Sequence, residues 1–371
     1  MEKKQHRIWI DINTAAVRHN FRTIRKKAAP AEVMAVVKAD AYGCDAETVA
    51  EICIHEGASR LGTASVCEAV RLKKKFHVPV QVIGSLTTDE IKPAIQHNII
   101  CPVTGMETAR RINRAALGLG RTATVHFLVD TGMGRLGVQA ENAVREISAC
   151  MRLRGLRAEG IYSHCPEADT KNSAYTRSQI KCFSAIVREL ETGGHTFRYK
   201  HLSNSYGVFF YPDAVFNLVR AGIALYGSSV HPDLLAYLKP VFSFYARLVS
   251  VRELPKGSSI GYARTHRLTK KTRVGTVSAG YADGIPFRLN RGGRVLVRGT
   301  ECPVIGRISM DYITVDLSNC PQARFNDKVV LIGRSKDKQI TVEDWAKISK
   351  SIPYEILCSA GRGKRAVVTI T

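Results

Sequence analysis

The sequence predicts an α/β protein, with an N-terminal (β/α)8 TIM-like barrel followed by a mostly β C-terminal domain. From residue 33 onward, short apolar runs alternate with amphipathic segments eight times in roughly 200 residues, which is typical of a parallel sheet closed into a barrel. After residue 240 the runs are strand-like and are separated by glycine-bearing or polar turns. An open doubly wound sheet also fits the alternation, but no Gly-x-Gly-x-x-Gly motif follows the first barrel strand. We therefore predict a barrel over residues 12–240 and a β domain over residues 241–371.

The chain begins with a strand that precedes the barrel. Residues 6–12 alternate polar and apolar side chains, and the strand over 6–11 is expected to pack with the C-terminal domain. A helix through Lys27 follows, with Asn13 or Asp11 as its N-cap. The barrel strands are expected at 33–38, 60–64, 79–84, 98–103, 123–129, 158–163, 197–202 and 217–219. The helices between them are expected at 45–56, 66–75, 88–96, 106–116, 140–151, 173–192 and 205–211.

The C-terminal domain is predicted from a series of strand-like runs. They cover 241–252, 273–280, 294–298, 302–306, 312–317, 328–333 and 366–371. Turns such as Pro255-Lys256-Gly257 separate them, and one helix is expected over 342–349 with Thr341 as its cap.

Composition and charge limit the classes of function. The 371 residues are 45% apolar and 23% charged, as in an ordinary globular protein. The net charge of +23 would suit nucleic-acid binding, but the basic clusters fall where helices or hairpins should end and accompany no zinc finger, aromatic RNA-binding signature or basic zipper. We expect a basic surface that attracts an anionic ligand, and no nucleic-acid partner. Binding to DNA or RNA at low salt would favour the alternative, a basic nucleic-acid-binding protein.

Membrane and metal sites are not expected either. Met1–His6 are polar and basic, no apolar signal-peptide core follows, and no apolar run has the length of a membrane span. We therefore expect a cytoplasmic protein without a membrane partner. The ten cysteines form no Cys-x-x-Cys pair and lie near no histidine pair at zinc-finger spacing, so we interpret them as reduced, mostly buried thiols and expect no metal.

Reactive side chains gather where the predicted barrel strands end. Lys38 ends the first strand, where a lysine packs poorly unless its amine reaches water or a ligand. Other candidates at the same edge are Arg135, His164, Asn204, Ser205 and Arg220. Each alone has a structural explanation, such as a turn, a helix cap or a salt bridge. Because the carboxyl ends of barrel strands meet at one edge, the set together favours a chemical site.

The same residues suggest a cofactor. Hydroxyl and N–H groups of Asn204, Ser205, Gly222 and Ile223 suit a phosphate. Lys38 suits a Schiff base with an aldehyde. A phosphate and an aldehyde on one small molecule suggest pyridoxal 5′-phosphate (PLP).

At these positions the sequence resembles the PLP-dependent alanine racemases, and the resemblance extends over nearly the whole chain. The matching motifs are Ala35–Gly43, Asp130–Gly137, His201–Ser205, Val219–Gly227, Gly261–Thr265, Gly280–Gly284, Gly306–Asp311 and Pro353–Glu355. So many motifs in the same order make the signal specific.

The resemblance implies a role for each site residue. Lys38 would hold PLP and act as one acid/base, and Tyr262 of the partner subunit would act as the other. Arg220 would meet the pyridine nitrogen, and His164 would hydrogen-bond in the same network. Residues implied at the phosphate are Tyr42, Ser205, Gly222, Ile223 and Tyr354. Residues implied at the substrate are Arg135 and, from the partner subunit, Met310, Asp311 and Tyr281.

The resemblance also implies the reaction and the assembly. The expected activity is interconversion of L- and D-alanine, which supplies D-alanine for peptidoglycan, in a head-to-tail homodimer with two shared sites. A racemase that prefers serine or another small amino acid is the alternative. A PLP-binding regulatory protein is disfavoured because the β domain with Tyr262 is present.

Physical chemistry agrees with these implied roles. Racemisation removes the α-proton from one face and returns it from the other, so two bases on opposite sides are needed. A free tyrosine has a pKa near ~10 and needs nearby positive charge to act as a base, and we expect Arg220 and His164 to supply that charge. An arginine at the pyridine nitrogen does not give up its proton, which favours a racemase over a decarboxylase of the same barrel fold.

One departure concerns Arg135. Relatives often have a carbamate-modified lysine on the preceding strand that orients this arginine, but the present chain has Leu128 there. We therefore expect Arg135 to be held in another way or to be more mobile.

Overall fold

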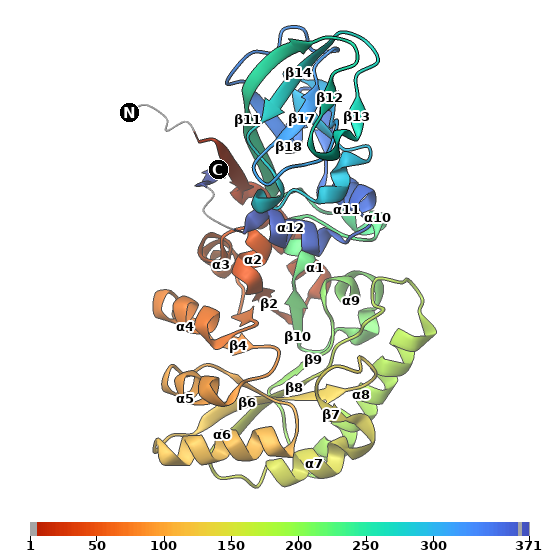
Figure 1. Ribbon diagram of the computed structural model, residues 1–371. Coiled ribbons are helices and arrows are strands. Elements are labelled where there is room, and N and C mark those ends of the chain that lie inside the picture. The colour runs from red at the N-terminus through yellow and green to blue at the C-terminus, as the bar shows by residue number, and fades with distance from the viewer. Residues whose placement is uncertain (1–5, 363–365, 371) are drawn as a thin grey trace.

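The computed structural model describes residues 6–362 and 366–370. Figure 1 shows two parts stacked along one long axis, with the barrel at one end and the β-rich part at the other. Strands from the two ends of the chain meet at the junction between these parts, where β1 (Ile8–Asn13) pairs in parallel with β20 (Ala366–Ile370).

Eight parallel strands form the predicted barrel. They are β2 (Glu32–Val36), β3 (Arg60–Thr63), β4 (Val80–Val82), β5 (Cys101–Val103), β6 (Ala123–Asp130), β8 (Leu156–Tyr162), β9 (Tyr199–His201) and β10 (Leu218–Ala221). They form two ladders, β10-β2-β3-β4 and β5-β6-β8-β9. A parallel bridge between Gln81 and Ile100 joins the ladders on one side, and Arg220 N–H donates to Ser203 C=O at 3.0 Å on the other. The barrel is therefore closed, and the open doubly wound sheet is wrong.

Helices cover the outside of this barrel (Figure 1). They are α1 (Thr14–Ala28), α3 (Ala46–His55), α4 (Val66–Lys75), α5 (Thr88–Gln96), α6 (Met106–Gly118), α7 (Ala143–Cys150), α8 (Ala174–Thr192) and α9 (Ser205–Phe210). Helix α1 comes before the first barrel strand, yet it packs against α3 and α9 and so takes the place of the eighth helix. Buried Asn20 anchors it by donating to the carbonyls of Leu225 (3.1 Å) and Lys239 (2.8 Å).

Local sequence explains where these helices begin and end. Asn13, one of the two predicted caps, accepts a hydrogen bond from Ala16 N–H at 2.9 Å at the start of α1. Ser65 and Glu68 form a reciprocal capping box at the start of α4. The predicted basic clusters end helices, with Arg25, Lys26 and Lys27 in the last turn of α1.

The C-terminal part consists of a nine-stranded sheet, a separate two-stranded sheet formed by β12 (Ser259–Ile260) and β13 (His266–Arg267), and two helices. Its other strands are β11 (Phe242–Leu254), β14 (Thr272–Val277), β15 (Arg294–Val297), β16 (Thr300–Pro303), β17 (Ile313–Asp316), β18 (Lys328–Ser335), β19 (Lys338–Ile340) and β20. Strand β1 lies between β11 and β20 in the nine-stranded sheet. The predicted helix is α11 (Val342–Ser349), with Thr341 as its cap.

A second C-terminal helix, α12 (Pro353–Gly361), was not predicted. It packs against a short helix, α2 (Lys38–Gly43), that follows the first barrel strand. The two backbones meet at glycines, because a Cβ on Gly43 would lie 2.6 Å from Cα of Gly361. This close approach brings α12 onto the mouth of the barrel.

Short elements complete the chain. They are β7 (Val138–Gln139), α10 (Pro232–Leu235) and the 3-10 helices η1 (Ala140–Asn142), η2 (Pro212–Ala214), η3 (Ile223–Tyr226), η4 (Tyr262–Arg264), η5 (Tyr281–Asp283) and η6 (Phe287–Asn290). All ten cysteines are free thiols, and seven of them are buried. Within residues 6–362 and 366–370, no helix is long and apolar enough to cross a membrane, and no cluster of three or more His, Cys, Asp or Glu could hold a metal ion.

Candidate active site

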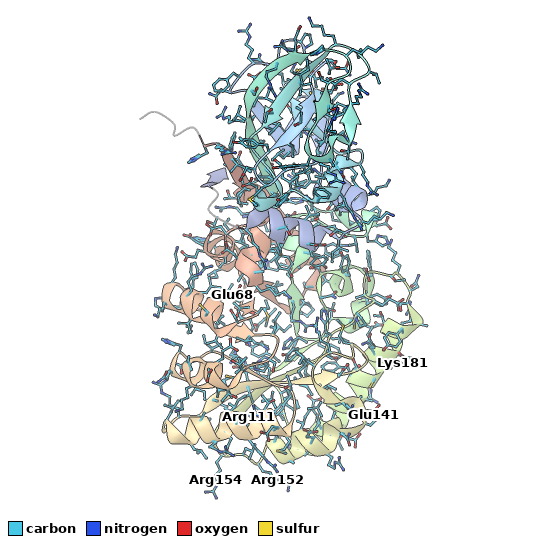
Figure 2. The ribbon with its side chains drawn as sticks, in the orientation of Figure 1. Glu68, Arg111, Glu141, Arg152, Arg154 and Lys181 are labelled. Carbon is cyan, nitrogen blue, oxygen red and sulfur yellow. The ribbon has the colours of Figure 1, made fainter. Side chains whose placement is uncertain are left out.

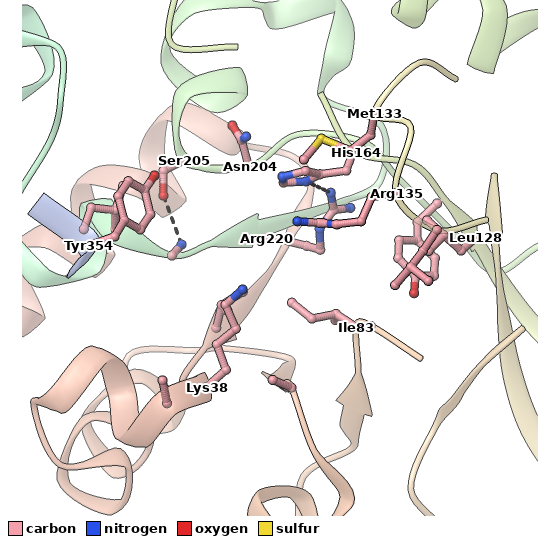
Figure 3. A pocket seen from close by; sticks show the side chains of 18 of the residues that line it. Lys38, Ile83, Leu128, Met133, Arg135, His164, Asn204, Ser205, Arg220 and Tyr354 are labelled. Carbon is pink, nitrogen blue, oxygen red and sulfur yellow. Dashed lines mark hydrogen bonds between the residues drawn. The ribbon is translucent and has the colours of Figure 1, made fainter. Parts of the chain in front are cut away.

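A cavity of about 430 Å³ opens where the barrel strands end, beneath α12. Figure 3 shows Lys38 pointing into it from one side, Ser205 and Tyr354 on a second side, and Arg220 with His164 on a third. Ten of the predicted site residues line it: Lys38, Tyr42, Arg135, His164, Asn204, Ser205, Arg220, Gly222, Ile223 and Tyr354. The folded chain therefore brings together residues that lie up to 316 positions apart, from 38 to 354.

Lys38 lies on an unusual backbone. The strand β2 ends at Val36, two residues earlier than predicted, and Lys38 begins α2 instead of ending the strand. Ala39 to Tyr42 have φ between 52° and 56° and ψ between 32° and 49°, which is one turn of left-handed helix. Residues with a Cβ rarely adopt this conformation because it is strained. The turn directs both Lys38 and Tyr42 into the cavity.

The surroundings of Lys38 favour its neutral amine. Burial is the largest influence that lowers the pKa of Lys38, followed by the positive charge of Arg135 and a smaller contribution from Arg220. A neutral amine is the form that attacks an aldehyde or accepts a proton. The structure thus supplies a physical reason for the reactivity expected of this lysine.

Arg220 is buried and held by several hydrogen bonds. Its Nη1 donates to Nδ1 of His201 at 2.9 Å and to the His201 carbonyl at 3.0 Å. Its Nη2 donates to the carbonyls of Ser163 (2.7 Å) and Leu202 (3.0 Å) and contacts Nδ1 of His164 at 3.2 Å. Burial lowers the pKa of Arg220 to about 10, which leaves the guanidinium charged at neutral pH. These bonds use only the two terminal nitrogens, and within the described residues no hydrogen bond occupies Nε.

The expectation that His164 supplies positive charge is wrong. Burial, followed by the charges of Arg220, Arg135 and Lys38, lowers the pKa of His164 to about 3. At neutral pH its imidazole is therefore uncharged, and Nδ1 accepts a hydrogen bond from Arg220 (Figure 3). Arg220 alone of this pair carries charge.

The opposite side of the cavity suits a phosphate. The Ser205 hydroxyl accepts from the N–H groups of Gly222 (3.0 Å) and Ala224 (3.2 Å), so its own proton is free to be donated to an anion. Burial raises the pKa of Tyr42 and of Tyr354, and both phenols therefore keep a proton to donate. A Cβ on Gly222 would lie 3.0 Å from the Tyr42 hydroxyl oxygen and would reduce this space. The donor set and the lysine together fit PLP.

Four predicted residues lie elsewhere. Tyr262 on η4, Tyr281 on η5 and Met310 have exposed fractions of 71%, 46% and 53%, and Asp311 is also exposed. None of them lines the cavity. Their segments adjoin, because Tyr281 N–H donates to Ser309 C=O at 3.0 Å and a Cβ on Gly261 would lie 3.1 Å from the Arg307 nitrogen. We call this group of four exposed residues the C-terminal patch.

Comparison with known proteins identifies the family. The family model described as alanine racemase, N-terminal domain, matches residues 12–230, and the one described as alanine racemase, C-terminal domain, matches residues 241–368. The chain belongs to the alanine racemase family. An alanine racemase of Desulforamulus reducens is 37% identical over 360 residues, which cover 95% of this chain and 96% of the relative.

Solved alanine racemases share the entire fold. The structure from Clostridium difficile 630 has a TM-score of 0.94 and 31% identity, covering 99% of this chain and 97% of that one. The structure from Bartonella henselae, which has covalently bound pyridoxal phosphate, has a TM-score of 0.89 and 28% identity, covering 98% and 99% of the two chains. The alanine racemase family is PLP-dependent, in agreement with the donor set of this cavity.

In this chain Arg135 is positioned through its backbone. The Asp130 carboxylate accepts from the N–H groups of Gly132 (2.9 Å), Met133 (2.7 Å) and Gly134 (2.9 Å), which fixes the turn that presents Arg135. Burial acts to raise the pKa of Asp130, but these hydrogen bonds lower it overall. Leu128 lines the cavity beside Arg135 and offers it only apolar contact. Within the described residues the Arg135 side chain has no hydrogen-bond partner, so it is free to meet a ligand.

Several lining residues were missed in the sequence. Tyr162 ends β8 and lines the cavity, and its buried hydroxyl has no hydrogen-bond partner within the described residues. Cys358 lines it from α12, one helical turn after Tyr354. A helix predicted from residue 353 would have placed Cys358 on the same face as Tyr354, because residues four apart are neighbours on a helix. His201, which holds Arg220, ends β9 and was recognised only as part of a motif.

Proposed function

We propose that this protein is an alanine racemase, which interconverts L- and D-alanine with PLP and two bases. The observation that carries the proposal is the position of Lys38, which points into the cavity with a lowered pKa opposite a fully held Arg220. Lys38 would serve one face of the substrate. Tyr262 of the partner subunit would serve the other.

The proposed roles of Lys38, Arg220 and Arg135 follow from the charge that each side chain carries. PLP, when bound, delocalises the electron pair that remains when the α-proton leaves. The lowered pKa of Lys38 favours its neutral amine, which can accept this proton at Nζ or return it. Arg220 would lie at the pyridine nitrogen and, because it keeps its own proton, would limit that delocalisation and favour return of the proton to Cα. Arg135 is the cation available for the substrate carboxylate.

A second subunit would complete the site. The C-terminal patch is exposed and carries the tyrosine that would act as second base, while the cavity of the same chain lacks it. A head-to-tail homodimer would place Tyr262, Met310, Asp311 and Tyr281 of the partner subunit over the cavity. With the barrel assigned to residues 12–240 and the β domain to 241–371, each site would combine the barrel of one chain and the β domain of the other.

The decisive experiment compares two lysine variants. Lys38→Ala should abolish both alanine racemisation and the visible absorbance of covalently attached PLP, because no amine remains at the cavity. Lys181, exposed on α8 far from the cavity, provides the control, and Lys181→Ala should retain both (Figure 2). Racemisation retained by folded Lys38→Ala would refute the proposal.

Substrate choice is tested in the same assay. We expect the wild-type protein to racemise alanine faster than serine, and the reverse order would make it a serine racemase. A role in supplying peptidoglycan precursors and a cytoplasmic location stay predictions from the sequence.

A further inference from the structure

A chain of hydrogen bonds crosses the interior of the barrel from the active site. Arg220 Nη1 contacts Nδ1 of His201 at 2.9 Å, and Nε2 of His201 contacts Nδ1 of His126 at 2.9 Å. Nε2 of His126 then contacts Oε2 of Glu159 at 3.2 Å. Glu159 lies at the middle of β8, three residues before the strand reaches the cavity at Tyr162. These hydrogen bonds therefore link the active-site arginine to a partly buried carboxylate farther from the mouth of the barrel.

The two ends of this chain fix the direction of every hydrogen bond. An ionised carboxylate only accepts, and a guanidinium only donates. His126 must then donate from Nε2 to Glu159, which leaves its Nδ1 as an acceptor. His201 must donate from Nε2 to His126, which leaves its Nδ1 to accept from Arg220. Arg60 Nη1 also lies 3.5 Å from Nε2 of His126, but it donates to the same Glu159 oxygen at the shorter distance of 3.2 Å. Only one tautomer of each neutral imidazole satisfies all three contacts between Arg220 and Glu159.

The barrel is shaped around this arrangement. His126 and His201 are fully buried, and a Cβ on Gly160 would lie 2.6 Å from the His126 ring, so a glycine is needed beside it. The Tyr162 ring stacks on His201 at 4.8 Å and 3°. Each imidazole is thus held in position by a side chain or a backbone contact of β8.

Charge within the network keeps Glu159 ionised. Burial acts to raise the pKa of Glu159, but the His126 hydrogen bond and the charge of Arg60 lower it to about 2. Arg60 donates to Oε2 at 3.2 Å and lies 3.6 Å above the Tyr199 ring. Burial is the largest influence on His126 and, with the charge of Arg60, lowers its pKa to about 4, although the hydrogen bond to Glu159 acts to raise it. Burial, followed by the charge of Arg220, lowers the pKa of His201 well below its usual value. Both histidines are therefore neutral at physiological pH.

Stability alone gives little reason for such a network. Barrel interiors are ordinarily filled by branched apolar side chains, and replacing buried ion pairs with apolar residues is often neutral or stabilising. We propose that Glu159 is a positioning residue for Arg220: it sets the tautomers of His126 and His201 and so keeps an acceptor facing the arginine at the cofactor site. This inference rests on the proposed function, in which Arg220 meets the pyridine nitrogen of PLP.

Glu159→Gln tests which atom donates and which accepts in each hydrogen bond between Glu159 and Arg220. The amide of glutamine has the same shape and can donate to Nε2 of His126, which allows the reversed set of tautomers. In that set Nδ1 of His201 carries a proton and faces the Arg220 donor, so the arginine must move. Arg157→Gln is the matched control, because Arg157 contacts Oε1 of Glu159 at 3.9 Å from the surface and takes no part in the chain.

The first readout needs neither cofactor nor activity. In protein without PLP and with 15N-labelled histidine, imidazole 15N shifts should show His126 and His201 both protonated on Nε2 in the wild type and in Arg157→Gln. Glu159→Gln should move the His201 proton to Nδ1. A wild-type His126 or His201 that is protonated on Nδ1, or charged at pH 7, would overturn the inference even if Glu159→Gln fails to fold.

The second readout is kinetic. In the PLP-loaded protein, Glu159→Gln should lower kcat about 10-fold, as is usual for residues that orient a ligand-binding side chain, with a much smaller change in KM for alanine. Unchanged kcat in a variant whose tautomers have shifted would refute the positioning role. A wild-type protein with the expected tautomers that fails to racemise alanine would refute the proposed function instead.

Discussion

At the scale of single residues, the site depends on which groups carry charge. Arg220 is buried, but five contacts hold its terminal nitrogens, and its pKa of about 10 leaves it charged at neutral pH. Burial, followed by neighbouring positive charge, lowers the pKa of Lys38 and of His164. For His164 the pKa of about 3 leaves the imidazole neutral at physiological pH.

Gly160 is required because the buried His126 ring leaves no room for a side chain at this position. Gly160→Ala should destabilise the protein by about 1–3 kcal/mol, because the new Cβ would lie 2.6 Å from the His126 ring in a closely packed interior. The measurement is the free energy of unfolding in urea. Gly118→Ala is the control: no atom lies within 4 Å of a Cβ at this helical position, so we expect a change of less than about 1 kcal/mol. Equal stability of the two variants would contradict the packing described for Gly160.

At the scale of elements, the left-handed turn of α2 is held by its neighbour α4. The Glu68 carboxylate accepts from the N–H groups of Ala39 (2.6 Å) and Asp40 (3.4 Å) with Oε1, and from Ala64 (3.1 Å) and Ser65 (3.3 Å) with Oε2. Figure 2 shows Glu68 between α4 and α2. Left-handed backbone costs roughly 1–2 kcal/mol per residue, so these bonds offset part of the strain beside Lys38.

Removing this clamp should affect both stability and catalysis. Glu68→Gln leaves one acceptor oxygen, and the amide nitrogen cannot accept from a backbone N–H, so we expect a loss of about 1–3 kcal/mol in urea unfolding and a lower kcat as Lys38 becomes less well placed. Glu107→Gln, which breaks only an exposed ion pair with Arg111, should change stability by less than about 1 kcal/mol. A Glu68→Gln protein with wild-type stability and kcat would show that the turn holds its shape without Glu68.

Helix α12 could not be predicted from the local sequence pattern. Its sequence contains the motif Pro353–Glu355, which indicated a site residue but not the helix that carries it. The helix is placed by the contact of Gly43 with Gly361, two residues 318 positions apart. Long-range contacts of this kind leave no periodic pattern in the sequence.

At the scale of the whole molecule, the expected second base lies on a different surface from the first. Tyr262 is 71% exposed on the C-terminal patch, whereas Lys38 lies in the cavity of the barrel. A homodimer that pairs patch and cavity would explain why large apolar and aromatic side chains such as Met310 and Tyr281 are exposed.

Mixed dimers test this assembly. Lys38→Ala and Tyr262→Phe homodimers should each be inactive or nearly so. A mixed dimer of the two variants would hold one site with both changes and one site with neither, so we expect about half of the wild-type activity per dimer. Co-expression with two affinity tags isolates the mixed species, and its racemase activity is the measurement. Mixed dimers as inactive as the parent variants would show that Tyr262 does not act across the interface.

The sequence by itself determined the fold class, the eight barrel strands, the cofactor type and ten residues that line the cavity. Most of these follow from short-range patterns, namely apolar runs and motifs that stand at the ends of successive strands, whereas Tyr42 and Tyr354 came only from the family resemblance. The predicted boundary between the two domains near residue 240 stays a prediction from the sequence.

The tertiary structure decided what those residues can do. It placed Lys38 on a left-handed turn, made His164 neutral, brought α12 over the cavity and joined Glu159 to Arg220 across the barrel. All four depend on burial and on contacts between segments far apart in the chain. Because pKa values and hydrogen-bond direction are set by such surroundings, the sequence could indicate the candidate site residues but not their protonation states.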